Sequence, residues 1–102
     1  MYTAKTAESR LEDRPREEPE TEHTRHYTVA AAAEPSVLPR VLELFALRDL
    51  IPRHVECRLD QGLHAGLRIE VTVQGLTDLQ AETVAARMRN LIPVTSVLLT
   101  RT

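Results

Sequence analysis

The order of its periodic segments constrains this 102-residue chain more than any other feature. Four segments alternate polar and apolar residues, as strands do, and two segments repeat apolar residues every three or four positions, as amphipathic helices do. Their order is strand, helix, strand, strand, helix, strand. The pattern predicts strands over residues 26–33, 53–60, 67–73 and 94–101, and helices over residues 36–49 and from Thr77 to just before Pro93.

The first predicted helix has a single apolar face. Ser36 is a suitable N-cap, because its hydroxyl can accept a hydrogen bond from a first-turn amide. Leu44 falls at the border of the apolar face and Leu47 on its polar side. These two leucines suit either tolerated surface positions or a contact with another subunit. The apolar face comprises Leu38, Val41, Leu42 and Phe45.

The second predicted helix begins with a capping box, in which Thr77 and Gln80 satisfy each other's backbone amides. Pro93 follows its end. Its apolar stripe comprises Ala81, Val84, Ala85, Met88 and Leu91.

A chain with this order of elements has one common arrangement. Right-handed strand–helix–strand connections place the first and third strands in the middle of a sheet, and each helix buries its one apolar face against that sheet. The sequence therefore predicts an α+β fold, a ferredoxin-like βαββαβ sandwich with a four-stranded antiparallel sheet and two helices on one face. The helix-free face is predicted to be wet or covered by a partner, and it carries Thr28, Arg68, Glu70 and Thr72.

Composition divides the chain near residue 25. Residues 1–25 hold 5 basic and 7 acidic side chains and few apolar ones, so they are predicted to be a disordered polar tail before one domain at 26–102. The balanced charge of that domain argues against nucleic-acid binding. No segment has the roughly 18 consecutive apolar residues of a membrane span, and the leader lacks a signal-peptide pattern. We therefore expect a cytoplasmic protein with no membrane contact.

The reactive side chains are scattered. Two of the four histidines, His23 and His26, lie in or beside the polar tail, and the other two lie on an outward strand position and in a turn. Cys57, the single cysteine, shares a strand face with Val55 and Leu59 and is predicted to be a buried packing residue. The sequence therefore predicts no catalytic residue, no bound metal and no cofactor.

Two stretches carry a resemblance to a known family. AAEPSVLPRVLELFALRDL, from Ala32 to Leu50, resembles the opening of an ACT domain, a small-molecule-sensing module with the same βαββαβ order. Within that family, EPSVLPRVLELF and the later RNLIPVTSVLL are most similar to the regulatory small subunit of acetolactate synthase. The resemblance covers residues 26 to about 99.

The resemblance implies an amino-acid site where the first helix begins, next to a second copy of the chain, and a homodimer that pairs through the first helix and the second strand. It also implies a large thiamine-diphosphate-dependent synthase as partner. The implied dimer contacts are Leu44, Leu47 and Val55. The implied ligand contacts are Glu34, Pro35, Ser36, Val37, Leu38, Leu50 and Ile51.

The chain departs from the family pattern at three single positions and at the pair Ile51-Pro52, where the small subunits commonly have Asn-Ile. Ala33 stands where the family often has Asp or Asn, Ser36 stands where it has Gly, and Asp49 stands where a second Gly often follows the helix. Glu34–Ser36 therefore also suit a plain helix start. The predicted function is a non-catalytic regulatory subunit of acetolactate synthase. The alternatives are a free-standing amino-acid sensor or oligomerisation module, and a small enzyme on the same fold.

Overall fold

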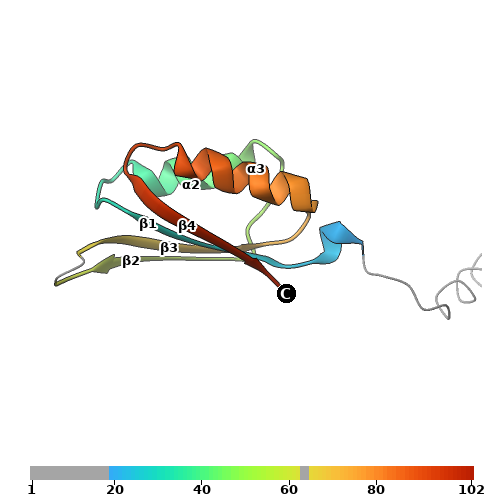
Figure 1. The fold of residues 1–102 in the computed structure, drawn as a ribbon, viewed down its shortest axis with the longest axis horizontal. Coiled ribbons are helices and arrows are strands. Elements are labelled where there is room, and N and C mark those ends of the chain that lie inside the picture. The colour runs from blue at the N-terminus through green and yellow to red at the C-terminus, as the bar shows by residue number, and fades with distance from the viewer. Residues whose placement is uncertain (1–18, 63–64) are drawn as a thin grey trace, which may run out of the picture.

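The computed structural model describes residues 19–62 and 65–102. Its four-stranded antiparallel sheet has the strand order β2-β3-β1-β4, and both helices cover one face of it (Figure 1). This arrangement confirms the predicted ferredoxin-like sandwich with the first and third strands at the centre. The elements are η1 Glu20–Glu22, β1 Arg25–Ala31, α2 Val37–Ala46, β2 His54–Asp60, β3 Gly66–Val73, α3 Asp78–Arg89 and β4 Val94–Arg101.

The central strands β1 and β3 form the sheet side of the core, because alternate side chains of both strands are buried under the helices. Tyr27 lies opposite Val71 and Val29 opposite Ile69, and all four are almost fully buried. The Tyr27 hydroxyl donates to the Ala81 carbonyl at 2.9 Å, and burial raises the pKa of Tyr27 to about 12. The one phenol in the core is therefore hydrogen-bonded and neutral.

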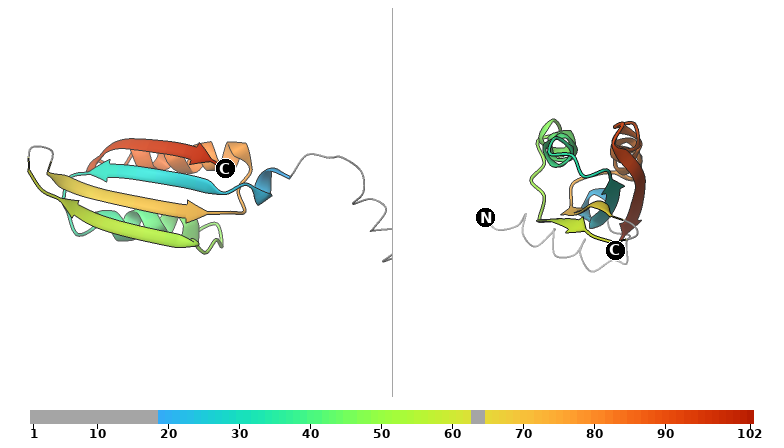
Figure 2. Two further views of the ribbon diagram at one scale, coloured as in Figure 1. Left: turned by 90° about the horizontal axis from the view of Figure 1, so that it is seen from below. Right: turned by 90° about the vertical axis from the view of Figure 1, so that its left-hand side faces the viewer.

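The buried face of α2 is rotated slightly from the predicted one. Val37, Val41 and Phe45 are fully buried, whereas Leu38 and Leu42 pack at the side of the core. The buried face of α3 agrees with the prediction, and the end-on view in Figure 2 shows the two helices side by side above the sheet. Within the described residues, neither helix has the length and apolar character of a membrane span.

The helix α2 ends at Ala46, three residues earlier than predicted, in a turn that closes around Asp49. The Leu50 amide donates to the Phe45 carbonyl (3.1 Å), and the Asp49 amide donates to the Ala46 carbonyl (3.0 Å). These two bonds form a Schellman motif, which needs one left-handed residue. Asp49 supplies it with a φ of 61°. Asp49 thus adopts the conformation for which a glycine is the usual choice.

Replacing Asp49 by glycine is therefore expected to raise the free energy of unfolding by about 0.5–1 kcal/mol, because glycine adopts a left-handed φ without a Cβ clash. A β-branched residue such as valine in Asp49→Val is expected to lower it. Urea unfolding of both variants and of Asp49→Asn checks this, since asparagine tolerates the conformation but removes the charge. Equal stabilities for the glycine and valine variants would contradict the assignment.

The folded part begins before the predicted boundary at residue 26. Residues 20–22 form η1, and the strand β1 starts at Arg25. The Gly75 amide donates to the Thr21 carbonyl (3.0 Å), and the Gln74 amide group donates to the Glu22 carbonyl (2.9 Å). Residues 19–25, assigned to the tail from composition, are thus held against the end of β3. The remainder of the predicted tail, 1–18, lies outside the described residues.

The edge strand β2 overturns the prediction for Cys57. Val55, Cys57 and Leu59 lie opposite buried or half-buried residues of β3 on the helix side of the sheet, yet all three are exposed. Cys57 is exposed, Val55 is 38% exposed and Leu59 is 58% exposed. The left-hand view in Figure 2 shows β2 as the outermost strand. Alternation therefore indicated the correct side of the sheet for these three side chains, but it did not indicate their exposure.

Candidate functional site

The turn between β1 and α2 holds five of the predicted ligand residues. Glu34, Pro35 and Ser36 are exposed, Val37 is buried in the core, and Leu38 is partly buried. Ser36 has a helical φ of −79° and ψ of −10°, and its side chain makes no capping hydrogen bond. Ser36 thus occupies the predicted N-cap position, but its hydroxyl does not make the predicted hydrogen bond and does not compete with a ligand for the first-turn amides.

The first turn of α2 nevertheless offers few donors. The Val37 amide already donates to the Glu34 carbonyl at 3.2 Å, and Pro39 carries no N–H. The Leu38 amide is thus the group that this turn presents to an anion, together with the positive end of the helix dipole. A carboxylate bound here would need a further contact from a side chain or a second chain.

The two remaining predicted ligand residues lie at the opposite end of α2. Leu50 is half-buried, and its Cδ2 atom lies 2.9 Å from the point that a Cβ on Gly75 would occupy, so Leu50 packs against the turn after β3. Ile51 is 88% exposed. The ten-residue α2 separates them from Glu34 by about 15 Å. One chain does not bring the two groups together.

The predicted dimer residues differ in exposure. Leu44 is partly buried and packs against the core, whereas Leu47 is 72% exposed. Val55 follows on β2, where the side chains of the edge are uncovered. Ile51 and Leu59 are further exposed apolar side chains, at 88% and 58%, in the loop after α2 and on β2. Exposed apolar residues thus occur at the end of α2, in the following loop and on β2.

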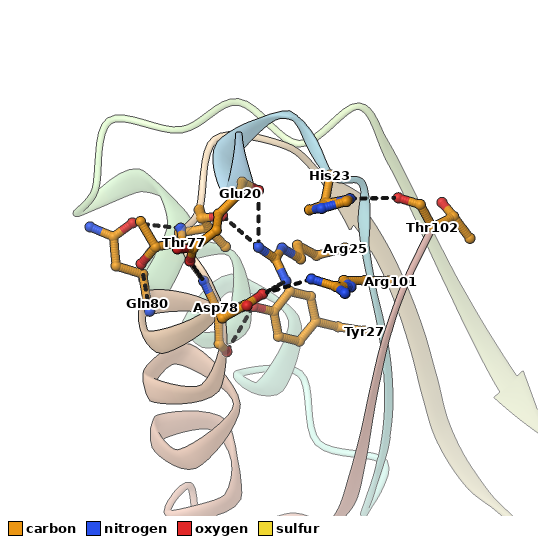
Figure 3. Close-up of polar contacts among 11 residues, drawn as sticks. Glu20, His23, Arg25, Tyr27, Thr77, Asp78, Gln80, Arg101 and Thr102 are labelled. Atoms are coloured by element: carbon orange, nitrogen blue, oxygen red, sulfur yellow. Dashed lines mark hydrogen bonds and ion pairs between the residues drawn. The ribbon is translucent and has the colours of Figure 1, made fainter. Parts of the chain in front are cut away.

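A polar cluster at the start of α3, which the sequence did not indicate, surrounds the buried Arg25 (Figure 3). The Arg25 guanidinium donates to Asp78 Oδ1 (2.6 Å), to the Leu76 carbonyl (2.8 Å) and to the Glu20 carbonyl (3.0 Å). The Glu20 carboxylate in turn accepts from the Asp78 amide (2.7 Å). The predicted capping box is confirmed beside it, where the Thr77 hydroxyl accepts from the Gln80 amide. The cluster ties η1 to the N-terminus of α3.

The helix-free face of the sheet is open, as predicted, with Arg68 exposed and Thr28, Glu70 and Thr72 half-buried. A shallow hollow of about 790 Å³ lies on this face, lined largely by alanine, threonine and serine side chains of β1 and β4. Its charged lining residues are Asp60 and Arg68. Across residues 19–62 and 65–102, no three His, Cys, Asp or Glu side chains are close enough to share a metal ion.

The sequence as a whole can be placed among known proteins. No curated protein matches the chain. A family model for an ACT-like domain matches residues 17–102. The chain belongs to the ACT-like domain family. ACT domains are regulatory and non-catalytic, so membership supports a regulatory, ligand-sensing role for this chain. No comparison points to acetolactate synthase, and that partner stays a prediction.

Solved structures share the fold of this ACT-like domain. The ACT domain from GTP pyrophosphokinase of Chlorobium tepidum has a TM-score of 0.61 at 8% identity, over 76% of this chain and 96% of that one. The C-terminal domain of the MgtC protein from Mycobacterium tuberculosis has a TM-score of 0.59 at 16% identity, over 84% of this chain and 94% of that one. A homoserine dehydrogenase from Thiobacillus denitrificans gives 0.61 at 18% identity, over 87% of this chain and 20% of that one.

The polar cluster makes the stability of this ACT-like domain depend on pH. The hydrogen bond from Arg25 holds the pKa of Asp78 below its usual value, although desolvation opposes the shift. Asp78 therefore binds a proton more readily in the unfolded chain than in the folded one. Its contribution to the free energy of unfolding is fully present above the ordinary carboxyl pKa of about 4, and it is lost as the pH falls through the lower pKa of the folded state.

Unfolding in urea between pH 6 and pH 2.5 checks this expectation. The free energy of unfolding is expected to fall less steeply below about pH 4 in Asp78→Asn than in the unaltered chain, because the variant lacks the titrating carboxyl. Parallel profiles for the two proteins would show that the Arg25–Asp78 contact does not distinguish the folded from the unfolded state.

Proposed function

We propose that this ACT-like domain is a non-catalytic regulatory protein that binds an amino-acid effector as a homodimer and acts on a separate catalytic subunit, in the manner of the small subunit of acetolactate synthase. The observation that carries the proposal is the exposed turn of Glu34, Pro35 and Ser36 at the start of α2, in a chain whose family is regulatory. The sequence EPSVLPRVLELF, which resembles that small subunit, spans this turn and most of α2.

The chemistry of the turn fits an α-amino acid. The Leu38 amide and the positive end of the α2 dipole suit the effector's carboxylate. Glu34 provides an exposed carboxylate for its ammonium group, one residue from Ala33, where the family often has Asp or Asn. Branched-chain amino acids are the effectors that the acetolactate synthase resemblance implies.

A second copy completes this site in the proposal. Leu50 and Ile51 lie one helix length from Glu34 within a chain, so a pocket built from both groups requires residues from two copies. The apolar surface of Leu47 and Val55 supports pairing at that end of α2. Effector binding and dimerisation are then coupled, because the ligand stabilises the state that binds it.

Calorimetric titration of the purified chain with valine, leucine and isoleucine tests the effector site. We expect saturable binding of at least one of them, weakened about tenfold in Glu34→Gln, since one charge-assisted contact to a ligand contributes about 1.4 kcal/mol. Glu43→Gln removes an exposed carboxylate further along, within α2, and serves as the matched control. Equal affinities for the two variants would remove Glu34 from the site.

Mixing with the purified large subunit of acetolactate synthase from the same organism tests the partner. The chain is expected to co-elute with that subunit and to raise its activity, and the effector is expected to reverse the gain. Amino-acid binding without any effect on the synthase would support the free-standing sensor instead.

A further inference from the structure

Two arginines stand directly opposite each other on the helix-free face of the sheet. The register of β2 with β3 pairs Arg58 with Arg68. Opposed side chains of an antiparallel pair have Cβ atoms about 5 Å apart, and like charges in this position destabilise a sheet. Both arginine side chains are about half exposed. The stability of the isolated sheet therefore does not explain why both positions are arginine.

Nearby carboxylates reduce the repulsion without forming hydrogen bonds to either arginine. Arg58 Nε lies 3.6 Å from Asp60 Oδ1, and its Nη1 atom lies 4.0 Å from Glu56 Oε2. Arg68 Nε lies 3.6 Å from Glu70 Oε2. These distances exceed the range of about 2.7–3.2 Å for N–H···O hydrogen bonds. The N–H groups of both guanidinium groups are thus available to an oxyanion, which pairs with arginine through two parallel hydrogen bonds.

The hollow on the helix-free face begins beside these arginines. Arg68 and Asp60 are its charged lining residues, and Arg58 approaches it through Asp60. Next to Arg68 in the sheet lies Ala30, and next to Ala30 lies Ser96. The volume of about 790 Å³ lies within the range of about 300–1,000 Å³ for small-molecule sites. A small ligand can therefore rest on the sheet with a charged group beside the Arg68 guanidinium.

Asp60 gives the hollow a second chemical function. It is half-buried and lies opposite Gly66, whose lack of a side chain leaves the carboxylate uncovered on that side. A carboxylate here repels a bare oxyanion, but it accepts a hydrogen bond from an ammonium or hydroxyl group. The lining thus favours a molecule that carries an oxyanion at one end and a hydrogen-bond donor at the other.

We propose that the hollow binds a small oxyanion, a phosphate ester or a carboxylate, that also carries an ammonium or hydroxyl group. The oxyanion lies between Arg58 and Arg68, and the donor group binds Asp60. The turn of Glu34–Ser36 does not line this hollow, so the proposal does not rest on the proposed function.

NMR titration of the isotope-labelled chain with three probes tests the site. Phosphoethanolamine carries a phosphate and an ammonium group, β-alanine replaces the phosphate by a carboxylate, and ethyl phosphate lacks the ammonium group. We expect phosphoethanolamine or β-alanine to shift the amide signals of Ala30, Gly66 and Arg68 with a dissociation constant of about 1 mM. The tighter of the two distinguishes a phosphate site from a carboxylate site. No saturable shift of these amides with either probe would overturn the proposal.

Substitution of the arginines tests where the oxyanion binds. Arg58→Gln and Arg68→Gln are each expected to weaken binding of the tighter probe about tenfold, because each removes a charge-assisted contact. Arg87→Gln is the matched control, since Arg87 is exposed on α3, which covers the other face of the sheet. Equal losses in all three variants would indicate general attraction by positive charge and would overturn the assignment to Arg58 and Arg68.

Asp60 and Ala30 test the other two parts of the proposal. The unaltered chain is expected to bind phosphoethanolamine about tenfold more tightly than ethyl phosphate, and Asp60→Asn is expected to remove most of that difference. Ala30→Met fills the hollow without changing its charge and is expected to weaken the tighter probe about tenfold. If Ala30→Met does not fold, the exposed Ser96→Met is measured in its place. Affinities unchanged in the methionine variant would place the ligand outside the hollow and overturn the proposal.

Discussion

Replacing Phe45 by alanine is expected to lower the free energy of unfolding by about 4 kcal/mol, the cost of removing a buried aromatic ring and leaving a cavity. Phe45 is fully buried, and it is the one phenylalanine of the chain. Its ring packs edge-on against Tyr27 with centroids 5.4 Å apart and planes at 70°. The neighbouring aliphatic side chains are held by the sheet and α3, so they cannot collapse into the space.

Equilibrium unfolding in urea measures this loss, with Leu47→Ala as control. Leu47 lies two residues further along, is 72% exposed, and is expected to change the stability of the separated chain by less than about 0.5 kcal/mol. If Phe45→Ala does not fold, Phe45→Leu is measured in its place, with a smaller expected loss in the free energy of unfolding. A loss below about 1 kcal/mol for Phe45→Ala would mean that α2 is not packed as the structure shows.

Much of this core could be predicted from sequence because burial repeats with the period of each element. The alternation in β1 and β3 and the stripe of α3 were assigned correctly, and the order of elements then left one sheet topology. The stripe of α2 was displaced by one position, since Val37 and Leu38 are both apolar and periodicity alone does not decide between them.

The errors arose where burial or hydrogen bonding depends on a distant segment. Cys57 has the pattern of an inward residue but lies on an edge strand whose side chains are exposed. Arg25 looks like the last charge of a polar tail, yet its three hydrogen-bond partners lie in η1 and around the start of α3. Ser36 is the N-cap of α2 as predicted, but its backbone is helical, not extended, and its hydroxyl makes no capping hydrogen bond.

The candidate site could be predicted from the sequence only in part, for the same reason. A turn such as Glu34–Ser36 is recognisable locally, but its distance from Leu50 and Ile51 depends on the length and direction of α2. The proposed function therefore assigns the two ends of that helix to a site shared by two copies.

Replacing Arg25 by methionine is expected to lower the free energy of unfolding by about 3 kcal/mol, because charged hydrogen bonds and a buried carbonyl partner are lost together. The Arg25 side chain is 4% exposed, and it is the donor that joins the Leu76 carbonyl, Asp78 and the Glu20 carbonyl. Methionine fills much of the volume, so the loss reflects the polar contacts more than a cavity.

Arg101 provides the matched control, since its guanidinium also reaches Asp78 Oδ1, at 3.3 Å, but is half exposed. Arg101→Met is expected to lower the free energy of unfolding by less than about 0.5 kcal/mol, because exposed ion pairs contribute little to stability. Hydrogen exchange separates local from global effects: in Arg25→Met the Gly75 amide, which donates to the Thr21 carbonyl, is expected to exchange faster as η1 detaches. If the two arginine variants unfold at the same urea concentration, burial adds nothing to the Arg25 contact, and η1 is held to the domain by its other hydrogen bonds.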